Sequence, residues 1–299
     1  MGTPAPRSRR VAALVSPLPE LLLGGLWLLV TLPALHPFDA LLAPLGLLLA
    51  ALAFAAHWVP DRLRAHWRAG LLFLSFALGH SLIGALAKTL GHPSVETVLA
   101  LWDDTLFGSS PVLAAQSLAL PGFSDVLQVA YAAFVLLAFP LPVLLFVQRR
   151  REELMLHLGV LTLAVTCVYA GYFLSPATTP ARMVAALGER APWQFEAPLP
   201  LTDFGLWVRS GIDALTFNHH DAFPSGHVAV TVFVLAQSWR LHRKLAWCLL
   251  PIGVLGLLAT LVLRYHFAID LIVGGLLGGV LCELGAPPRT TSVSDDQSS

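Results

Sequence analysis

Residues 123–151 read FSDVLQVAYAAFVLLAFPLPVLLFVQRRR, an apolar run that ends in three consecutive arginines. A helix that crosses the hydrocarbon core of a bilayer needs about 20 mostly apolar residues. The run up to Val147 is long enough, and arginines are the flank expected at a cytoplasmic surface. This stretch therefore predicts a membrane span that ends in a cytoplasmic turn.

The composition of the whole chain agrees with this interpretation. Of its 299 residues, 56% are hydrophobic and only 12% are charged, whereas a soluble domain carries about 25% charged residues. The formal net charge is zero, so nothing in the sequence indicates a nucleic-acid partner. The three cysteines lie singly in apolar stretches, where cysteine usually acts as a small hydrophobic residue. They predict neither a disulfide nor a metal site.

Further apolar stretches predict an all-α, polytopic membrane helix bundle of about eight spans. The expected spans are 17–35, 39–59, 69–88, 123–147, 155–175, 223–239, 245–263 and 266–284. The expected domains are a disordered cytoplasmic tail (1–16), two additional N-terminal spans (17–68), a six-span catalytic core (69–284) and a second disordered cytoplasmic tail (285–299). Between two of the spans, residues 95–106 have helical spacing of apolar residues and predict an interfacial helix.

The lysines and arginines predict the orientation. Of the 18 in the chain, 13 fall on the side of the N-terminus and 5 on the opposite side. Positive residues accumulate in cytoplasmic loops. We therefore expect a multi-pass protein of the cell membrane with both termini in the cytoplasm.

The first polar motif is PSGH at residues 224–227, directly before an apolar run. Proline favours the first position of a helix, so this motif predicts a helix start on the extracytoplasmic side. A helix start exposes N–H groups that suit an anion, Ser225 adds a hydroxyl, and Gly226 permits a close approach. His227 would lie in the first turn. The alternative is a helix cap with an interfacial histidine.

The second polar motif is RYHFAID at residues 264–270. His266 and Asp270 are four residues apart and are expected on one helical face. An aspartate in an apolar helix is costly and indicates function by default. It would accept a hydrogen bond from Nδ1–H and leave Nε2 free as a nucleophile. Two alternatives remain: a polar pair that joins helices, and an iron or zinc site with His227.

Together these motifs resemble the type 2 phosphatidic-acid phosphatase superfamily, over the six spans from about 69 to 284. DTLFG at 104–108 and GYFL at 171–174 resemble its bacterial branch related to inositol phosphorylceramide synthases. The resemblance implies a membrane enzyme with an extracytoplasmic active site that acts on a lipid phosphate. It invokes no metal and no cofactor.

The resemblance also implies a role for each matching residue. His266 would be the nucleophile that forms a phosphohistidine, and Asp270 the carboxylate that orients it. His227 would protonate the departing lipid alcohol. Ser225 and the amide of Gly226 would bind the phosphate.

The sequence departs from the family pattern at its arginines. Where the family has Ser-Arg before the nucleophilic histidine, this chain has Ala259 and Thr260. Arg182 and Arg264 are the expected substitutes, because a guanidinium binds phosphate through two hydrogen bonds. Each arginine has the alternative of reaching lipid headgroups at the interface.

The sequence leaves the phosphoryl acceptor open. With water the enzyme is a lipid phosphatase, and with an alcohol such as inositol it is a headgroup phosphotransferase. A different class of protein, a transporter with a proton-relaying His–Asp pair, is the alternative. A transporter should show paired, interrupted helices in its two halves, and the sequence has none.

Overall fold

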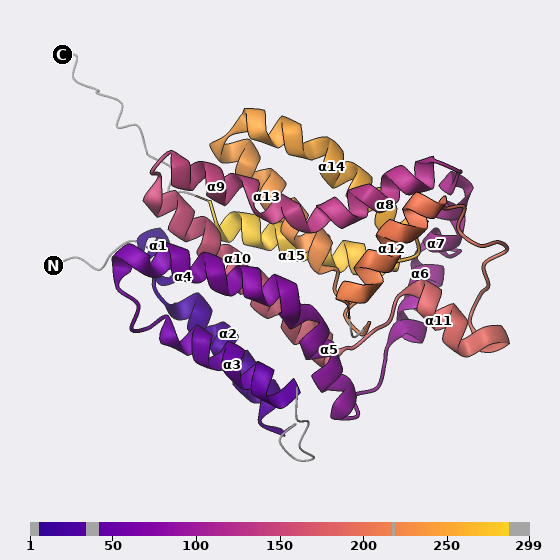
Figure 1. The fold of residues 1–299 in the computed structure, drawn as a ribbon, viewed down its shortest axis with the longest axis horizontal. Helices are drawn as coiled ribbons and strands as arrows, with labels where there is room; N and C mark the ends of the chain where they lie inside the picture. The colour runs from indigo at the N-terminus through magenta and orange to yellow at the C-terminus, as the bar shows by residue number, and fades with distance from the viewer. Residues whose placement is uncertain (1–5, 34–41, 217–218, 287–299) are drawn as a thin grey trace, which may run out of the picture.

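The computed structural model describes residues 6–33, 42–216 and 219–286 (Figure 1). Within these ranges the chain is helical apart from turns and one isolated bridge between Ala177 and Asp221. The predicted all-α helix bundle is confirmed. The helices of eight or more residues are α1 (Pro6–Val15), α2 (Leu18–Thr31), α3 (Leu42–Ala55), α4 (Asp61–Leu74), α5 (His80–Thr89), α6 (Glu96–Phe107), α8 (Phe123–Phe134), α9 (Pro140–Val147), α10 (Arg151–Leu174), α11 (Pro180–Leu187), α12 (Asp203–Leu215), α13 (Gly226–Leu241), α14 (Arg243–Val262) and α15 (Ala268–Leu284).

Four helical stretches are long and apolar enough to cross a membrane: Asp61–Thr89, Phe123–Val147, Arg151–Leu174 and Arg243–Val262. They make the chain a membrane protein. Helices α2 and α3 are apolar but shorter, and α13 and α15 have 16 and 17 residues. At 1.5 Å per residue, a 17-residue helix is about 25 Å long, less than the ~30 Å hydrocarbon core. The total of eight spans stays a prediction.

Helix α10 forms the centre of the bundle. Most of its residues are buried, and it packs against α2, α4, α5, α9 and α13. Its Gly171 faces the ring of Pro224, so a side chain at this position would collide with the segment before α13. The central helix thus sets where α13 begins.

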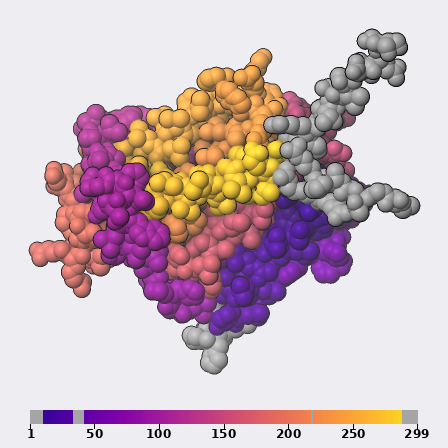
Figure 2. All heavy atoms as spheres, turned by 180° about the vertical axis from the view of Figure 1, so that it is seen from behind, coloured from indigo at the N-terminus to yellow at the C-terminus, as the bar shows by residue number. Residues whose placement is uncertain are grey.

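Helices α13, α14 and α15 complete the core together with α8. Helix α15 packs closely along α13, and α14 packs on α8. Figure 2 shows α15 (yellow) along one face of the molecule, with α6 (purple) at the end where α15 begins. We call the end at which α13 and α15 begin the site end, and the end at which α4 and α10 begin the arginine end.

The N-terminal segment differs from the expectation. The sequence predicts disorder for residues 1–16, whereas Pro6–Val15 forms α1 and packs on α10. A buried ion pair holds the end of α1 and the start of α2 in place. Arg68 of α4 binds Glu20 of α2 and also donates to the carbonyl of Leu14 in α1 at 3.0 Å. Residues 1–5 and 287–299 of the two predicted tails lie outside the described residues.

The helices at the site end carry exposed apolar side chains. The helix predicted at residues 95–106 is confirmed as α6, whereas its interfacial position stays a prediction, and α11 and α12 lie near it (Figure 1). On α12, Trp207 and Leu215 are 71% and 77% exposed. Large exposed apolar side chains on an amphipathic helix suit the plane of a membrane interface. These helices surround the candidate site.

Candidate active site

Two helix starts that lie far apart in the sequence meet at the site end. The backbone N–H of Ser225, before α13, donates to the carbonyl of Asp270 in the first turn of α15 at 3.2 Å. A side chain at Gly274 of α15 would collide with the carbonyl oxygen of Ser225. The glycine therefore permits the contact that places the PSGH motif beside His266.

His266 lies in the turn between α14 and α15 rather than on a helix. Its backbone N–H donates to the carbonyl of Thr260 at 3.0 Å, and Arg264 has a φ of 65°, the left-handed conformation that ends many helices. The expectation that His266 and Asp270 share a helical face is wrong in this detail, because α15 begins only at Ala268. Asp270 instead reaches back from the first turn.

The pairing of His266 with Asp270 is nevertheless present. Nδ1 of His266 lies 3.3 Å from Oδ2 of Asp270, which also accepts from the N–H of Phe267 at 2.9 Å. Both side chains are buried. Because a carboxylate accepts hydrogen bonds, Nδ1 carries the proton and Nε2 keeps its lone pair. Oδ1 of Asp270 has no partner among the described residues.

Ser225 faces the free nitrogen of His266. Its Oγ lies 3.5 Å from Nε2 and 3.4 Å from the N–H of Val228, from which it accepts. Ser225 is thus the N-cap of α13, which confirms the predicted helix start, although Pro224 precedes the cap instead of occupying the first helical position. The hydroxyl lies between a helix start and a basic nitrogen.

Gly226 has a packing role that the sequence did not reveal. A Cβ at this position would lie 2.8 Å from Oη of Tyr172 and 2.9 Å from Cγ1 of Val168, both on α10. Any larger residue would push the start of α13 away from α10. The sequence analysis assigned Gly226 to the close approach of an anion, and the absence of a side chain here is also needed for α13 to pack against α10.

His227 lies in the first turn of α13, beside two aromatic rings of α8. Its ring is nearly parallel to Phe134, with centroids 5.5 Å apart, and lies 5.1 Å from Tyr131. The centroids of the His227 and His266 rings are 6.1 Å apart. Two imidazoles from two helix starts therefore lie within reach of one small group.

The two predicted phosphate-binding arginines have different surroundings. Nε of Arg264 donates to Gln116 at 2.8 Å, Nη2 donates to the carbonyl of Ala197 at 2.7 Å, and the guanidinium lies 3.8 Å from the Phe195 ring centroid. Burial and the nearby Arg209 lower the pKa of Arg264 to about 10, so it stays charged at neutral pH. These contacts hold the turn that carries His266.

Arg182 lies on α11 at the surface. Its Nη2 is 3.4 Å from Oδ1 of Asp213 on α12, and both side chains are about half exposed, at 43% and 45%. A surface pair of this kind contributes little stability. Its guanidinium is therefore easily redirected to a ligand.

Asp103 of α6 is a residue that the sequence analysis missed. Its two carboxylate oxygens accept from the N–H groups of Ala268 and Ile269, each at 2.8 Å, and it is fully buried. Burial raises the pKa of Asp103, although these two hydrogen bonds act in the opposite direction. The signal in the sequence is an acidic residue on the buried face of α6, together with Leu99 and Ala100. Asp103 fixes the start of α15.

Arg209 of α12 is a second missed residue. Its guanidinium lies 5.0 Å from the ring centroid of Tyr265, and Nη1 donates to the carbonyl of Leu263 at 3.4 Å. Tyr265 stacks on Tyr131 at 3.9 Å, and Tyr131 contacts His227. A chain of contacts thus joins the surface helix α12 to the candidate acid.

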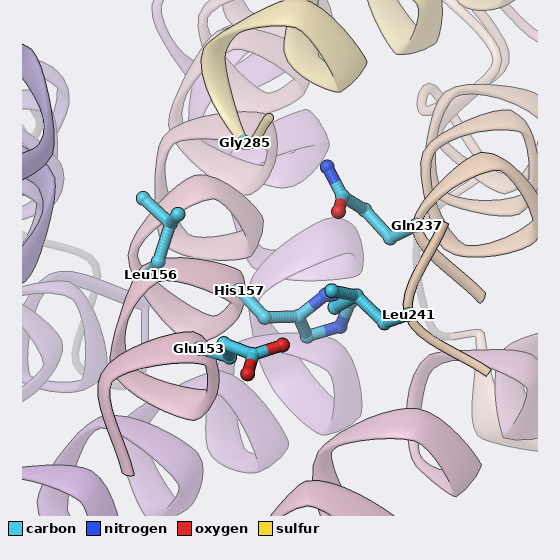
Figure 3. A pocket seen from close by; sticks show the side chains of 6 residues that line it. All are labelled: Glu153, Leu156, His157, Gln237, Leu241 and Gly285. Carbon is cyan, nitrogen blue, oxygen red and sulfur yellow. The ribbon is translucent and has the colours of Figure 1, made fainter. Parts of the chain in front are cut away.

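The other end of the bundle holds a histidine that serves as a comparison. Figure 3 shows His157 and Glu153 of α10 facing Gln237 and Leu241 of α13, around a cavity of about 10 Å³. Both ring nitrogens of His157 lack a partner among the described residues, and Glu153 binds Arg150 instead. The cavity has room for about one water. Without an orienting carboxylate, His157 does not form the arrangement found at His266.

Within residues 6–33, 42–216 and 219–286, no group of three or more His, Cys, Asp or Glu residues has the arrangement of a metal site.

A family model described as the PAP2 superfamily matches residues 96–283, more than half of the chain. No curated protein and no solved structure matches the chain.

Proposed function

Because the chain belongs to the PAP2 superfamily, whose members are phosphatases and phosphotransferases, we propose that it cleaves or transfers the phosphoryl group of a lipid phosphate. One observation carries the proposal. Nδ1 of His266 lies beside the carboxylate of Asp270, while among the described residues Nε2 has only the long contact to Ser225. This is the state in which an imidazole is a nucleophile.

In the first step, the lone pair of Nε2 of His266 attacks the phosphorus atom of the substrate. A nitrogen–phosphorus bond forms, and the bond from phosphorus to the lipid oxygen breaks. His227, in its protonated form, donates its proton to that oxygen, so the lipid leaves as an alcohol. Asp270 stabilises the positive charge that develops on His266.

In the second step, an acceptor hydroxyl attacks the phosphohistidine. The acceptor loses its proton to His227, the new oxygen–phosphorus bond forms, and His266 is released. From a lipid phosphomonoester, water as acceptor gives free phosphate and an alcohol gives a new phosphomonoester. From a lipid phosphodiester, the headgroup stays on the transferred phosphorus, and an alcohol acceptor gives a new phosphodiester. Transfer to an alcohol, as the resemblance to the branch related to inositol phosphorylceramide synthases implies, is one form of the proposal. The contacts at the site support phosphoryl transfer without choosing the acceptor.

The phosphate oxygens need donors, because phosphoryl transfer relies on positioning and charge stabilisation. The start of α13 supplies a positive dipole end, and the hydroxyl of Ser225 lies 3.5 Å from the attacking nitrogen. We assign Arg182 to the incoming phosphate, since its pairing with Asp213 is exposed. We assign Arg264 to holding the turn, since two of its nitrogens already donate to the protein.

The site end is proposed to face the extracytoplasmic side of the cell membrane, with both termini in the cytoplasm. The clusters of arginines at the arginine end support this orientation. Single cysteines test it with an impermeant thiol reagent on intact cells, in a background without the native cysteines. Arg190→Cys should label, whereas Gln148→Cys should label only after permeabilisation. The reverse pattern would place the site in the cytoplasm.

Phosphate release from a panel of lipid phosphates by the purified protein tests the function. We expect turnover of at least one lipid, and trapping of a phosphorylated protein after an acid-free quench. His266→Ala should abolish both signals, whereas His57→Ala, at an exposed turn, should leave both unchanged. Turnover by His266→Ala would contradict the mechanism. Inactivity of the wild-type protein on every lipid of the panel would contradict the substrate class.

A further inference from the structure

A groove lies at the arginine end, between α4 and α9, with α10 as its floor. Helices α4 and α9 each pack against α10 (Figure 1), and they meet through the rings of His66 and Phe146, whose centroids are 5.5 Å apart. The space between them has a volume of about 260 Å³. Ala65 and Ala69 line the α4 wall together with His66 and Leu72, and the short side chains of the two alanines leave space unfilled.

The lining of the groove is apolar and partly open. Val143 and Phe146 of α9 line it and are 59% and 55% exposed, and Leu154 and Leu158 of α10 form the floor. The polar side chain of the lining is His66. Ordered water needs two to four polar partners, which this lining does not offer. On the surface of a membrane helix bundle, the material that fills such a groove is hydrocarbon.

Two arginines without partners lie where the groove reaches the arginine end. Arg62 precedes His66 by one helical turn on α4, and therefore lies on the same face as the groove. Arg149 lies three residues after Phe146 and two residues beyond the end of α9 at Val147. Both are exposed, and neither guanidinium has a hydrogen bond or ion pair among the described residues.

The neighbouring arginines are already engaged. Arg64 pairs with Asp61, and Arg150 pairs with Glu153. Arg151 donates to the carbonyl of Asp61. Among the described arginines of α4 and of the turn between α9 and α10, Arg62 and Arg149 are therefore the two whose guanidinium groups are not engaged within the protein.

We propose that the groove binds one anionic phospholipid. One acyl chain lies between α4 and α9, and the phosphate of the headgroup lies between Arg62 and Arg149. This site is separate from the candidate active site, because it is at the opposite end of the bundle and contains none of the residues assigned to phosphoryl transfer. The lipid bound here is a ligand and is not consumed.

Native mass spectrometry of the detergent-purified protein tests the proposal. Phosphatidylglycerol and phosphatidylcholine with identical chains are added in separate titrations. We expect phosphatidylglycerol to bind about 30-fold more tightly, since each of the two arginines near an anionic headgroup contributes about 1 kcal/mol, or about fivefold. Equal retention of the two lipids would overturn the headgroup assignment.

Two sets of variants locate the binding. The exposed pair Arg62→Gln and Arg149→Gln should lower the affinity for phosphatidylglycerol to that for phosphatidylcholine. Ala69→Phe should fill the groove and remove both lipids. Its control is Gly70→Phe, one residue further along α4, where an added Cβ meets no atom within 4 Å. Loss of lipid in Gly70→Phe, or full retention in Ala69→Phe, would show that the chain binds elsewhere.

Discussion

The two ends of the bundle each contain a fully buried carboxylate, and the two differ in their hydrogen bonding. At the arginine end, both oxygens of Glu20 bind Arg68, whose other N–H groups donate to backbone carbonyls at 2.7–3.0 Å. At the site end, Asp270 has one oxygen with two partners and one oxygen with none among the described residues. Both carboxylates have 0% exposure.

The difference in hydrogen bonding distinguishes a carboxylate that stabilises the fold, Glu20, from one proposed to take part in the reaction, Asp270. The carbonyls that Arg68 reaches belong to Leu14, Ser16 and Met155. Because every donor and acceptor is used, this network ties the segment between α1 and α2 to α4 and α10. Asp270 keeps unused acceptor capacity, and its partner His266 keeps a free lone pair. The free lone pair of His266 is what the proposed attack on phosphorus requires.

The largest expected effect comes from Asp270→Asn. The amide cannot hold Nδ1–H as a carboxylate does, so the tautomer and the developing charge on His266 lose their support. We expect kcat to fall by about 10³–10⁴-fold, or about 4–5 kcal/mol, with little change in the melting temperature. Phosphate release on the preferred lipid measures it. A loss of less than about threefold would remove Asp270 from the mechanism.

The next effect should be on stability and comes from Arg68→Ala. This change leaves Glu20 buried without its partner, which costs about 3–5 kcal/mol. We expect a lower melting temperature in detergent, and an unchanged kcat for the fraction that stays folded. The double change Glu20→Leu with Arg68→Met should recover most of the loss, because it removes both charges. A wild-type melting temperature in Arg68→Ala would contradict the structural role.

The sequence predicted the parts of this picture that depend on local spacing. PSGH before an apolar run predicted the start of α13, and the four-residue spacing predicted the contact between His266 and Asp270. Apolar runs predicted the membrane helix bundle. Each of these features depends on residues that are close together in the chain, so each can be predicted from the sequence alone.

The parts that the sequence missed depend on contacts between distant residues. Asp103 and Ala268 are 165 positions apart, and Arg68 and Glu20 are 48 positions apart. Arg68 is one of the 13 lysines and arginines that the charge count places on the cytoplasmic side, and a count does not reveal which arginine is buried. The start of α15 at Ala268 instead of His266 follows from the left-handed conformation of Arg264. A glycine is the usual sequence signal for this conformation, and the turn contains none.

A smaller effect on activity is expected from Asp103→Asn. The asparagine keeps one acceptor oxygen for the two N–H groups at the start of α15, so the turn that carries His266 loosens. We expect kcat to fall about tenfold, the equivalent of one hydrogen bond to a charged group, with KM unchanged. Asp104→Asn on the same helix is the control and should retain full activity. Equal losses in both variants would indicate a general effect on α6.

The smallest expected effect is a pH-dependent change in stability from Asp221→Asn. Burial raises the pKa of Asp221 in the folded protein, and the nearby His80 and His266 oppose this only in part. The folded state therefore holds a proton that the unfolded state releases. The stability that this proton provides is complete below the unfolded pKa, about 3.9, and is lost as the pH rises through the folded value. Above the unfolded pKa, folding must therefore either keep this proton or bring a charge into a half-buried position, and Asp221→Asn removes that cost while keeping the shape. We expect the variant to melt about 2 °C higher at pH 7, corresponding to less than about 1 kcal/mol, and this difference to disappear as the pH falls toward 4. Melting curves in detergent at a series of pH values measure it. A difference that does not depend on pH would mean that the substitution acts through packing and not through the charge.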